Sequence, residues 1–245
     1  MIDTHAHLDA CADPSDVLVA RARAAGVTRI LTVGTTLERC RGALALAEAH
    51  DEVYAILGVH PHEAGHDHDL GGLRELLAHP KAVAVGETGL DHYRDYAPHD
   101  RQRVLFEAQL ALASELGRAV VVHTRAADDE TLEALAGFDG AVVLHCFSSA
   151  RMLRPALDRG YYISFAGNVT YKNAPDLRVA ASQVPADRLL AETDCPYLAP
   201  QPVRGRPNEP ALVVHTYEAL AAARGEDPGR LGERIAANAA AVFGL

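Results

Sequence analysis

The chain opens with the stretch Ile2-Asp3-Thr4-His5-Ala6-His7, a run that ends in two histidines two residues apart. Alternate side chains of a β-strand share a face, so the imidazoles of His5 and His7 are expected to point the same way, roughly 7 Å apart. Such a pair can chelate a metal, although surface or hydrogen-bonded core histidines would have the same spacing. Later runs also end in side chains that ligate metals: 82–87 ends in Glu87, 119–123 in His123, 141–145 in His145 and 188–194 in Asp194. This repetition favours a metal site.

Working outward from this stretch, eight β-rich segments alternate with helix-like segments. The predicted strands are 2–7, 28–34, 53–59, 82–87, 119–123, 141–145, 161–165 and 188–193. Several are continuously apolar, as parallel strands buried on both faces are. We predict an α/β fold, a (β/α)8 TIM barrel in which residues 1–245 form a single domain. A doubly wound open sheet is the alternative, but no Gly-x-Gly-x-x-Gly or phosphate-binding loop follows any strand.

Helix punctuation lies between the predicted strands. The clearest helix is predicted over His99–Leu116, where Leu105, Gln109, Leu112 and Leu116 recur at helical spacing before Gly117. Elsewhere we predict Ser15 and Asp128 as N-caps, Gly26 and Gly137 as helix stops, and Pro14 and Pro155 near helix starts.

Composition limits the function classes. The formal charge of −10 disfavours tight non-specific binding of nucleic acid over the whole surface, but it leaves room for a local site. No apolar run reaches the roughly 18 residues of a membrane span, and the start of the chain lacks a signal-like segment. The four cysteines form no Cys-x-x-Cys pair and are expected to be reduced: Cys11, Cys40, Cys146 and Cys195. We therefore expect a cytoplasmic protein.

In a closed barrel all strand ends surround one axis, and the carboxyl ends carry the chemistry. We predict that the ligand-type side chains at these ends form one metal site: His5, His7, Glu87, His123, His145 and Asp194. This set exceeds what one catalytic ion takes from protein, so two divalent ions about 3.5 to 4 Å apart fit better. Glu87 lies midway in strand order and is the predicted bridge between the ions. For His60 and His62 in the Gly-Val-His-Pro-His turn, a purely hydrogen-bonding loop role remains equally open.

The ligand types also indicate the metal and the substrate class. Histidine-rich ligation favours Zn, Mn, Fe, Co or Ni over Mg, which prefers oxygen ligands, and the sequence does not choose among them. Four neutral imidazoles and two carboxylates leave two divalent ions with about two positive charges for a hydroxide and an anionic substrate. A phosphodiester fits that balance.

These residues lie within motifs that resemble the TatD family of metal-dependent deoxyribonucleases, a branch of the amidohydrolase-like hydrolases. The resemblance covers nearly the whole chain and rests on seven motifs in order: Asp3-Thr-His-Ala-His-Leu-Asp9, Gly58-Val-His-Pro-His62, Val85-Gly-Glu-Thr-Gly-Leu-Asp91, Val122-His-Thr-Arg125, Leu144-His-Cys-Phe-Ser148, Glu192-Thr-Asp-Cys-Pro196 and Arg204-Gly-Arg-Pro-Asn-Glu209. The resemblance implies a TIM barrel with the same six ligands and an activity that hydrolyses DNA as an exonuclease. Ser149 departs from the glycine usual in the family, which affects only a local turn.

The expected mechanism is hydrolysis by a metal-activated water, with Glu87 and Asp194 as catalytic carboxylates and Asp194 as the acceptor of the water's proton. Arg125 follows His123 on the same side of an extended segment and is predicted to bind a phosphate oxygen together with His62. A salt bridge from Arg125 to Asp128 or Asp129 is the alternative.

Two further regions carry predictions. The proline-rich loop from Asp194 to Asn208 is read as a stiff rim whose Arg204 and Arg206 bind substrate. Arg94 and Lys172 would add to a locally basic mouth, unless these charges are simply solvated among neighbouring aspartates. Glu192, one layer deeper than Asp194, either orients a ligand or packs in the core.

Two rival functions remain open. One is hydrolysis of an amide or ester, including an aminoacyl ester on tRNA, because an activated hydroxide also attacks carbonyl carbon. Related amidohydrolases often bridge their metals with a modified lysine after strand four, where this chain has Glu87. The other is a non-catalytic binding barrel, against which every expected ligand position is filled.

Overall fold

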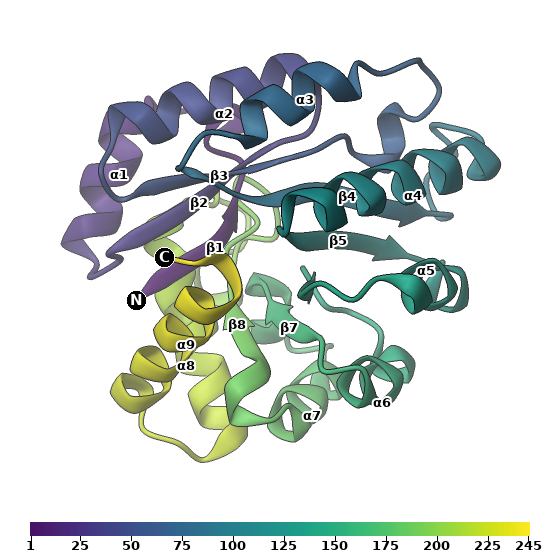
Figure 1. The fold of residues 1–245 in the computed structure, drawn as a ribbon. Helices are drawn as coiled ribbons and strands as arrows, with labels where there is room; N and C mark the ends of the chain where they lie inside the picture. The colour runs from purple at the N-terminus through teal and green to yellow at the C-terminus, as the bar shows by residue number, and fades with distance from the viewer.

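The computed structural model describes residues 1–245 and contains one parallel sheet with its strands in the order β1 to β8 (Figure 1). The strands are β1 (Ile2–Ala6), β2 (Arg29–Gly34), β3 (Val53–Leu57), β4 (Ala82–Asp91), β5 (Ala119–Arg125), β6 (Val142–Leu144), β7 (Tyr162–Phe165) and β8 (Leu189–Ala191). The sheet closes on itself because Ala6 pairs in parallel with Cys195, and the His7 N–H donates to the Cys195 carbonyl at 2.8 Å. The predicted TIM barrel is confirmed.

Helices surround the barrel and cover its outer face (Figure 1). They are α1 (Ser15–Ala24), α2 (Leu37–Ala49), α3 (Leu70–Leu77), α4 (His99–Leu116), α5 (Asp128–Ala134), α6 (Ala150–Asp158), α7 (Pro175–Gln183), α8 (Val213–Arg224) and α9 (Pro228–Phe243). Short 3-10 turns join them: η1 (Leu8–Ala10), η2 (Pro61–Glu63), η3 (Leu135–Gly137), η4 (Gly167–Thr170), η5 (Ala186–Arg188), η6 (Gln201–Val203) and η7 (Pro210–Leu212).

Helix α4 has the predicted bounds and ends at Gly117, which adopts the left-handed conformation with φ 62°. Two glutamines on its buried face support the strand ends. Gln109 pairs with both the N–H and the carbonyl of Val59, and Gln102 pairs with both backbone groups of Asp91. These amide pairs satisfy backbone groups that the sheet leaves unpaired, so α4 fixes the loop after β3 and the end of β4.

Several helix-boundary predictions were wrong in detail. Ser15 and Asp128 are the first residues of α1 and α5, so Pro14 and Ala127 occupy the N-cap positions and neither helix has a side-chain cap. Pro155 lies inside α6 rather than near its start. Helix α1 ends at Ala24, just before Gly26, whereas Gly137 closes the short 3-10 turn after α5.

Strand β4 runs four residues past its predicted end at Glu87 and carries Asp91 into the barrel. Gly89 permits this extension, since its φ of +138° is open to glycine and a Cβ there would lie 2.0 Å from the His123 carbonyl oxygen. A register irregularity between Val85 and Thr88 accompanies the change of direction. Gly89 therefore allows β4 and β5 to approach closely beyond the predicted end of the strand.

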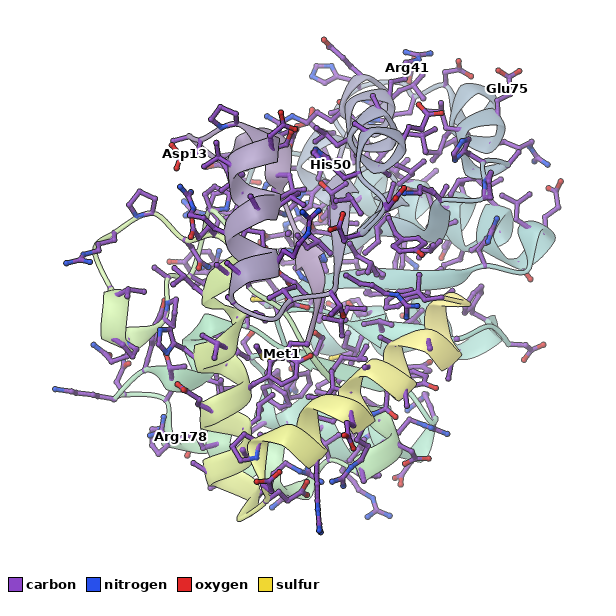
Figure 2. The ribbon with its side chains drawn as sticks, turned by 90° about the vertical axis from the view of Figure 1, so that its left-hand side faces the viewer. Met1, Asp13, Arg41, His50, Glu75 and Arg178 are labelled. Carbon is purple, nitrogen blue, oxygen red and sulfur yellow. The ribbon has the colours of Figure 1, made fainter.

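Charged side chains lie on the outer helices, as Figure 2 shows for Arg41 on α2 and Glu75 on α3, both exposed. The apolar side chains of strands and inner helix faces form one continuous core. None of the helices combines the length and the apolar character that crossing a membrane requires.

Candidate active site

The two histidines of β1 converge at the carboxyl end of the barrel. Their Nε2 atoms are 3.3 Å apart, and both side chains are almost completely buried. The side chain that precedes His5 points elsewhere: the Thr4 hydroxyl donates to the Ala191 carbonyl at 3.1 Å on the neighbouring strand β8. Two imidazole nitrogens facing one another at this distance provide a natural place for a shared cation.

Glu87 is at the centre of the site. Its Oε2 lies 3.4 Å from His5 Nε2 and 3.6 Å from His7 Nε2. Its Oε1 lies 2.9 Å from His123 Nδ1 and 2.9 Å from His145 Nε2. One carboxylate oxygen therefore faces each of the two histidine groups, which is the arrangement of a bridging ligand.

Asp194 follows β8, the strand that neighbours β1 where the barrel closes. Its Oδ1 lies 3.5 Å from His7 Nε2, and its backbone N–H donates to the His5 carbonyl at 2.9 Å. Its φ of 54° is unusual for a residue other than glycine, and the residues just after β5 and β6, Ala126 and Cys146, share this left-handed conformation. Sharp turns thus follow three of the strand ends that carry site residues.

Glu192 orients His145. Its Oε1 accepts hydrogen bonds from His145 Nδ1 at 3.2 Å and from the Cys146 N–H at 2.8 Å, while its Oε2 accepts from the Ser164 hydroxyl. Because Nδ1 is occupied, His145 presents Nε2 to the site. This buried nitrogen lies 2.9 Å from Glu87 Oε1 but outside hydrogen-bonding geometry, so it makes no hydrogen bond within the chain.

The protonation states suit metal ligation. Burial alone would raise the pKa of Glu87, but the imidazoles of His145 and His60 hold that pKa well below its usual value. Burial, together with the neighbouring His145, lowers the pKa of His5 to about 4, so this imidazole is neutral. For His145 burial is outweighed by Glu87 and Glu192, which raise its pKa well above the usual value, so protons compete strongly for this position in the absence of a metal.

The structure adds residues that the sequence left open or missed. His60 Nδ1 accepts from the His62 N–H at 3.1 Å, which directs Nε2 to Glu87 Oε1 at 3.2 Å. Asp91 is buried, and its Oδ2 lies 2.8 Å from His62 Nε2 and 3.1 Å from His123 Nε2. His60, His62 and His123 thus form a third group of possible ligand atoms. The Gly-Val-His-Pro-His turn was the available signal for His60, whereas Asp91 became visible only with the extension of β4.

The predicted substrate-binding arginines lie at the rim. Arg125 makes no salt bridge to Asp128 or Asp129, and its guanidinium stacks 4.0 Å from the centre of the Tyr93 ring. The Arg204 guanidinium lies 4.1 Å from the centre of the Tyr171 ring. Arg206 is exposed and makes no side-chain contact with an acidic group. These three cations are free to meet an anionic ligand.

A closed barrel with imidazoles and carboxylates gathered at the carboxyl ends of its strands defines a metal-dependent hydrolase. The profile of the family described as TatD related DNase matches residues 2–244, and the chain belongs to this family. It is 41% identical to an uncharacterized metal-dependent hydrolase TatD from Mycobacterium tuberculosis, over 100% of this chain and 98% of that protein. The chain is 38% identical to the 3′-5′ ssDNA/RNA exonuclease TatD of Erwinia tasmaniensis, over 94% and 93% of the two chains. The crystal structure of YJJV, a TatD homologue from Escherichia coli K12, matches with a TM-score of 0.94 and 32% identity, over 100% and 98% of the chains.

Proposed function

We propose that this protein is a nuclease that hydrolyses phosphodiester bonds of DNA and releases nucleotides from a strand end. One observation carries the proposal: the two oxygens of Glu87 face two separate histidine groups, which suits a pair of cations poised over a phosphodiester. The exonuclease name of a relative that is 38% identical supports the same substrate class. The free thiols of the four cysteines fit a reducing compartment, so we place the enzyme in the cytoplasm.

The side chains fit a pair of divalent ions. His5, His7 and Asp194 would hold one, His123 and His145 the other, and Glu87 would bridge them. His145 Nε2 supports this assignment, because it makes no hydrogen bond within the chain, and a buried nitrogen without a hydrogen bond is costly unless a ligand satisfies it. When bound, the ions would activate a water and neutralise charge on the phosphate. Imidazole-rich ligation favours Zn, Mn, Fe, Co or Ni over Mg.

The remaining steps belong to the chain's own groups. Asp194 directs Oδ1 toward His7, and its Oδ2 has no partner within the chain, so Oδ2 is the atom that accepts the proton of the attacking water. Arg125 donates to a non-bridging phosphate oxygen through its planar guanidinium. His62 engages Asp91 through Nε2, which leaves Nδ1 to face the substrate.

A parallel assay tests the proposal. Purified protein is loaded with Zn²⁺ or Mn²⁺ and given 5′-labelled single-stranded DNA, an aminoacyl-tRNA and an uncharged carboxylic ester. We expect stepwise shortening of the DNA that stops in chelator and returns with metal. If the acyl substrates are cleaved and the DNA is not, the protein is an esterase and not a nuclease. Inertness toward all three in every metal would favour a binding barrel.

Two variants separate the roles of ligand and substrate contact. His5→Ala should lose bound metal and hydrolysis together. Arg125→Ala should keep its metal but slow phosphodiester cleavage by roughly 10- to 150-fold, the range of one charge-assisted hydrogen bond. If Arg125→Ala slows the uncharged ester as much as the DNA, the guanidinium does not act on phosphate.

A further inference from the structure

Large exposed apolar side chains are few on this protein, and the aromatic ones gather in one region. They are Tyr93, Tyr96 and Tyr197, with exposed fractions of 64%, 64% and 55%. All three lie on loops that follow strands, Tyr93 and Tyr96 after β4 and Tyr197 after β8. Single exposed apolar side chains are ordinary, but a restriction of the exposed rings to the mouth of the barrel indicates a function there.

The exposed rings are fixed beside the site. The Tyr197 ring meets the His7 ring edge-on, with centroids 5.8 Å apart. Its backbone is anchored on both sides, because its N–H donates to the Asp194 carbonyl at 2.9 Å and its carbonyl accepts from the Asn208 amide. The Tyr93 N–H donates to Asp91 Oδ1 at 3.0 Å. The backbone that carries each ring therefore does not need to be ordered by a ligand, which lowers the entropy cost of binding one.

The two rings also lie on opposite sides of the site. In a closed ring of eight strands, β4 and β5 lie across the barrel from β8 and β1. Tyr93 belongs to the side of Asp91 and Arg125, and Tyr197 belongs to the side of His7 and Asp194. Glu87 lies between them. A chain laid across the mouth with its reacting group over Glu87 would therefore meet one tyrosine on each side.

Each side also carries a cation. The Arg125 guanidinium stacks on the Tyr93 ring, and the Arg204 guanidinium stacks on the Tyr171 ring, in the part of the rim that follows β7 and β8. Aromatic rings interleaved with arginines are the equipment of proteins that bind single-stranded nucleic acid without sequence preference: rings stack on bases and guanidinium groups meet phosphates. A base in a duplex is already stacked and cannot use such a platform.

We propose that Tyr197 and Tyr93 are stacking platforms for the bases on the two sides of the scissile phosphodiester. They restrict the substrate to single strands and hold the reacting phosphate over Glu87. This proposal rests on the proposed nuclease function. Stacking is worth roughly 5- to 140-fold per base, so each platform is expected to contribute within that range.

The test compares two strands of equal length, one ordinary single-stranded DNA and one in which tetrahydrofuran abasic units replace every nucleoside. Tyr197→Ala and Tyr93→Ala are each compared with the matching Phe variant, which keeps the ring. Val179→Ala is the control, because Val179 is 55% exposed on α7, away from the mouth. Metal content is measured for every variant, and kcat/KM is measured for both strands.

We expect the Ala variants to lose about 5- to 140-fold in kcat/KM on ordinary DNA and nothing on the abasic strand, while the Phe variants and Val179→Ala match the wild type. Equal losses on both strands, or losses in the Phe variants, would overturn the stacking role. Full activity of the Ala variants on ordinary DNA would also overturn it and would leave the nuclease function standing. A wild-type enzyme that cleaves neither strand would instead remove the proposed function beneath it.

Discussion

Replacing Glu192 by Gln separates an orienting role from plain packing. The side chain is fully buried, and its Oε1 accepts from both His145 Nδ1 and the Cys146 N–H. Gln keeps the shape and one carbonyl oxygen for these two donors but removes the negative charge. The bond from His145 then changes from charge-assisted to neutral, a loss of about 1 to 1.5 kcal/mol. If Glu192 holds His145 for a metal, the metal affinity should fall roughly 5- to 13-fold.

The sign of the pH dependence sharpens this prediction. Glu192 helps to raise the pKa of His145, so loss of the charge lowers that pKa and weakens the competition from protons. The reduced competition offsets part of the affinity loss in acid. The loss should therefore be greater at pH 8 than at pH 6.

The assay is a metal competition titration against a chelating indicator at both pH values, with thermal unfolding as a check on the fold. Affinity equal to that of the wild type at both pH values would refute the orienting role and leave Glu192 as a packing residue. Glu192→Ala is a poor substitute, because it leaves the His145 and Cys146 donors buried without an acceptor and endangers the fold itself.

Further predictions concern the proton acceptor, the barrel wall and a buried thiol. Asp194→Asn should retain at least one metal ion yet hydrolyse DNA at least about 100-fold more slowly. Near-normal turnover of this variant at neutral pH would show that another group or the solvent accepts the proton. Gly89→Ala should destabilise the fold by about 2 to 6 kcal/mol in a denaturant titration, since its Cβ would strike the His123 carbonyl oxygen, whereas Gly137→Ala, with open space around it, should be near neutral. Burial raises the pKa of Cys40 to about 12, so its thiol stays protonated at pH 8 and should resist alkylation until the protein unfolds; prompt labelling of the native protein would contradict this.

The barrel could be predicted from sequence because its signal is repeated. Most of the predicted strands are followed by a polar residue suited to catalysis, and the buried cores of β5 and β6 lie where continuous apolar residues indicated. Glu87 was placed midway between two groups from strand order alone, and its two oxygens face those groups. Strand order fixes neighbours in a closed ring, so this inference needed no side-chain detail.

The features that escaped prediction depend on contacts between distant segments. Asp91 was assigned no role because the strand was expected to end at Glu87, and the close approach of Gly89 to the His123 carbonyl, which lets the strand continue, depends on a contact with β5. His60 could not be separated from an ordinary loop histidine until its Nε2 was seen to face Glu87. The stacking of Arg125 on Tyr93 joins the end of β5 to the loop after β4, whose conformation the sequence does not specify.

The hydrogen bond from the Asp194 N–H to the His5 carbonyl, at 2.9 Å, also bears on biosynthesis. On the ribosome His5 and His7 emerge well before Asp194, which is made nearly two hundred residues later. A growing chain therefore carries only part of the ligand set, and we expect tight metal binding only late in folding. We expect metal uptake in refolding experiments to lag behind the gain of helical signal; uptake that precedes it would show that β1 binds metal before the barrel closes. If uptake lags as expected, the supply of metal affects the activity of the finished barrel and not its assembly.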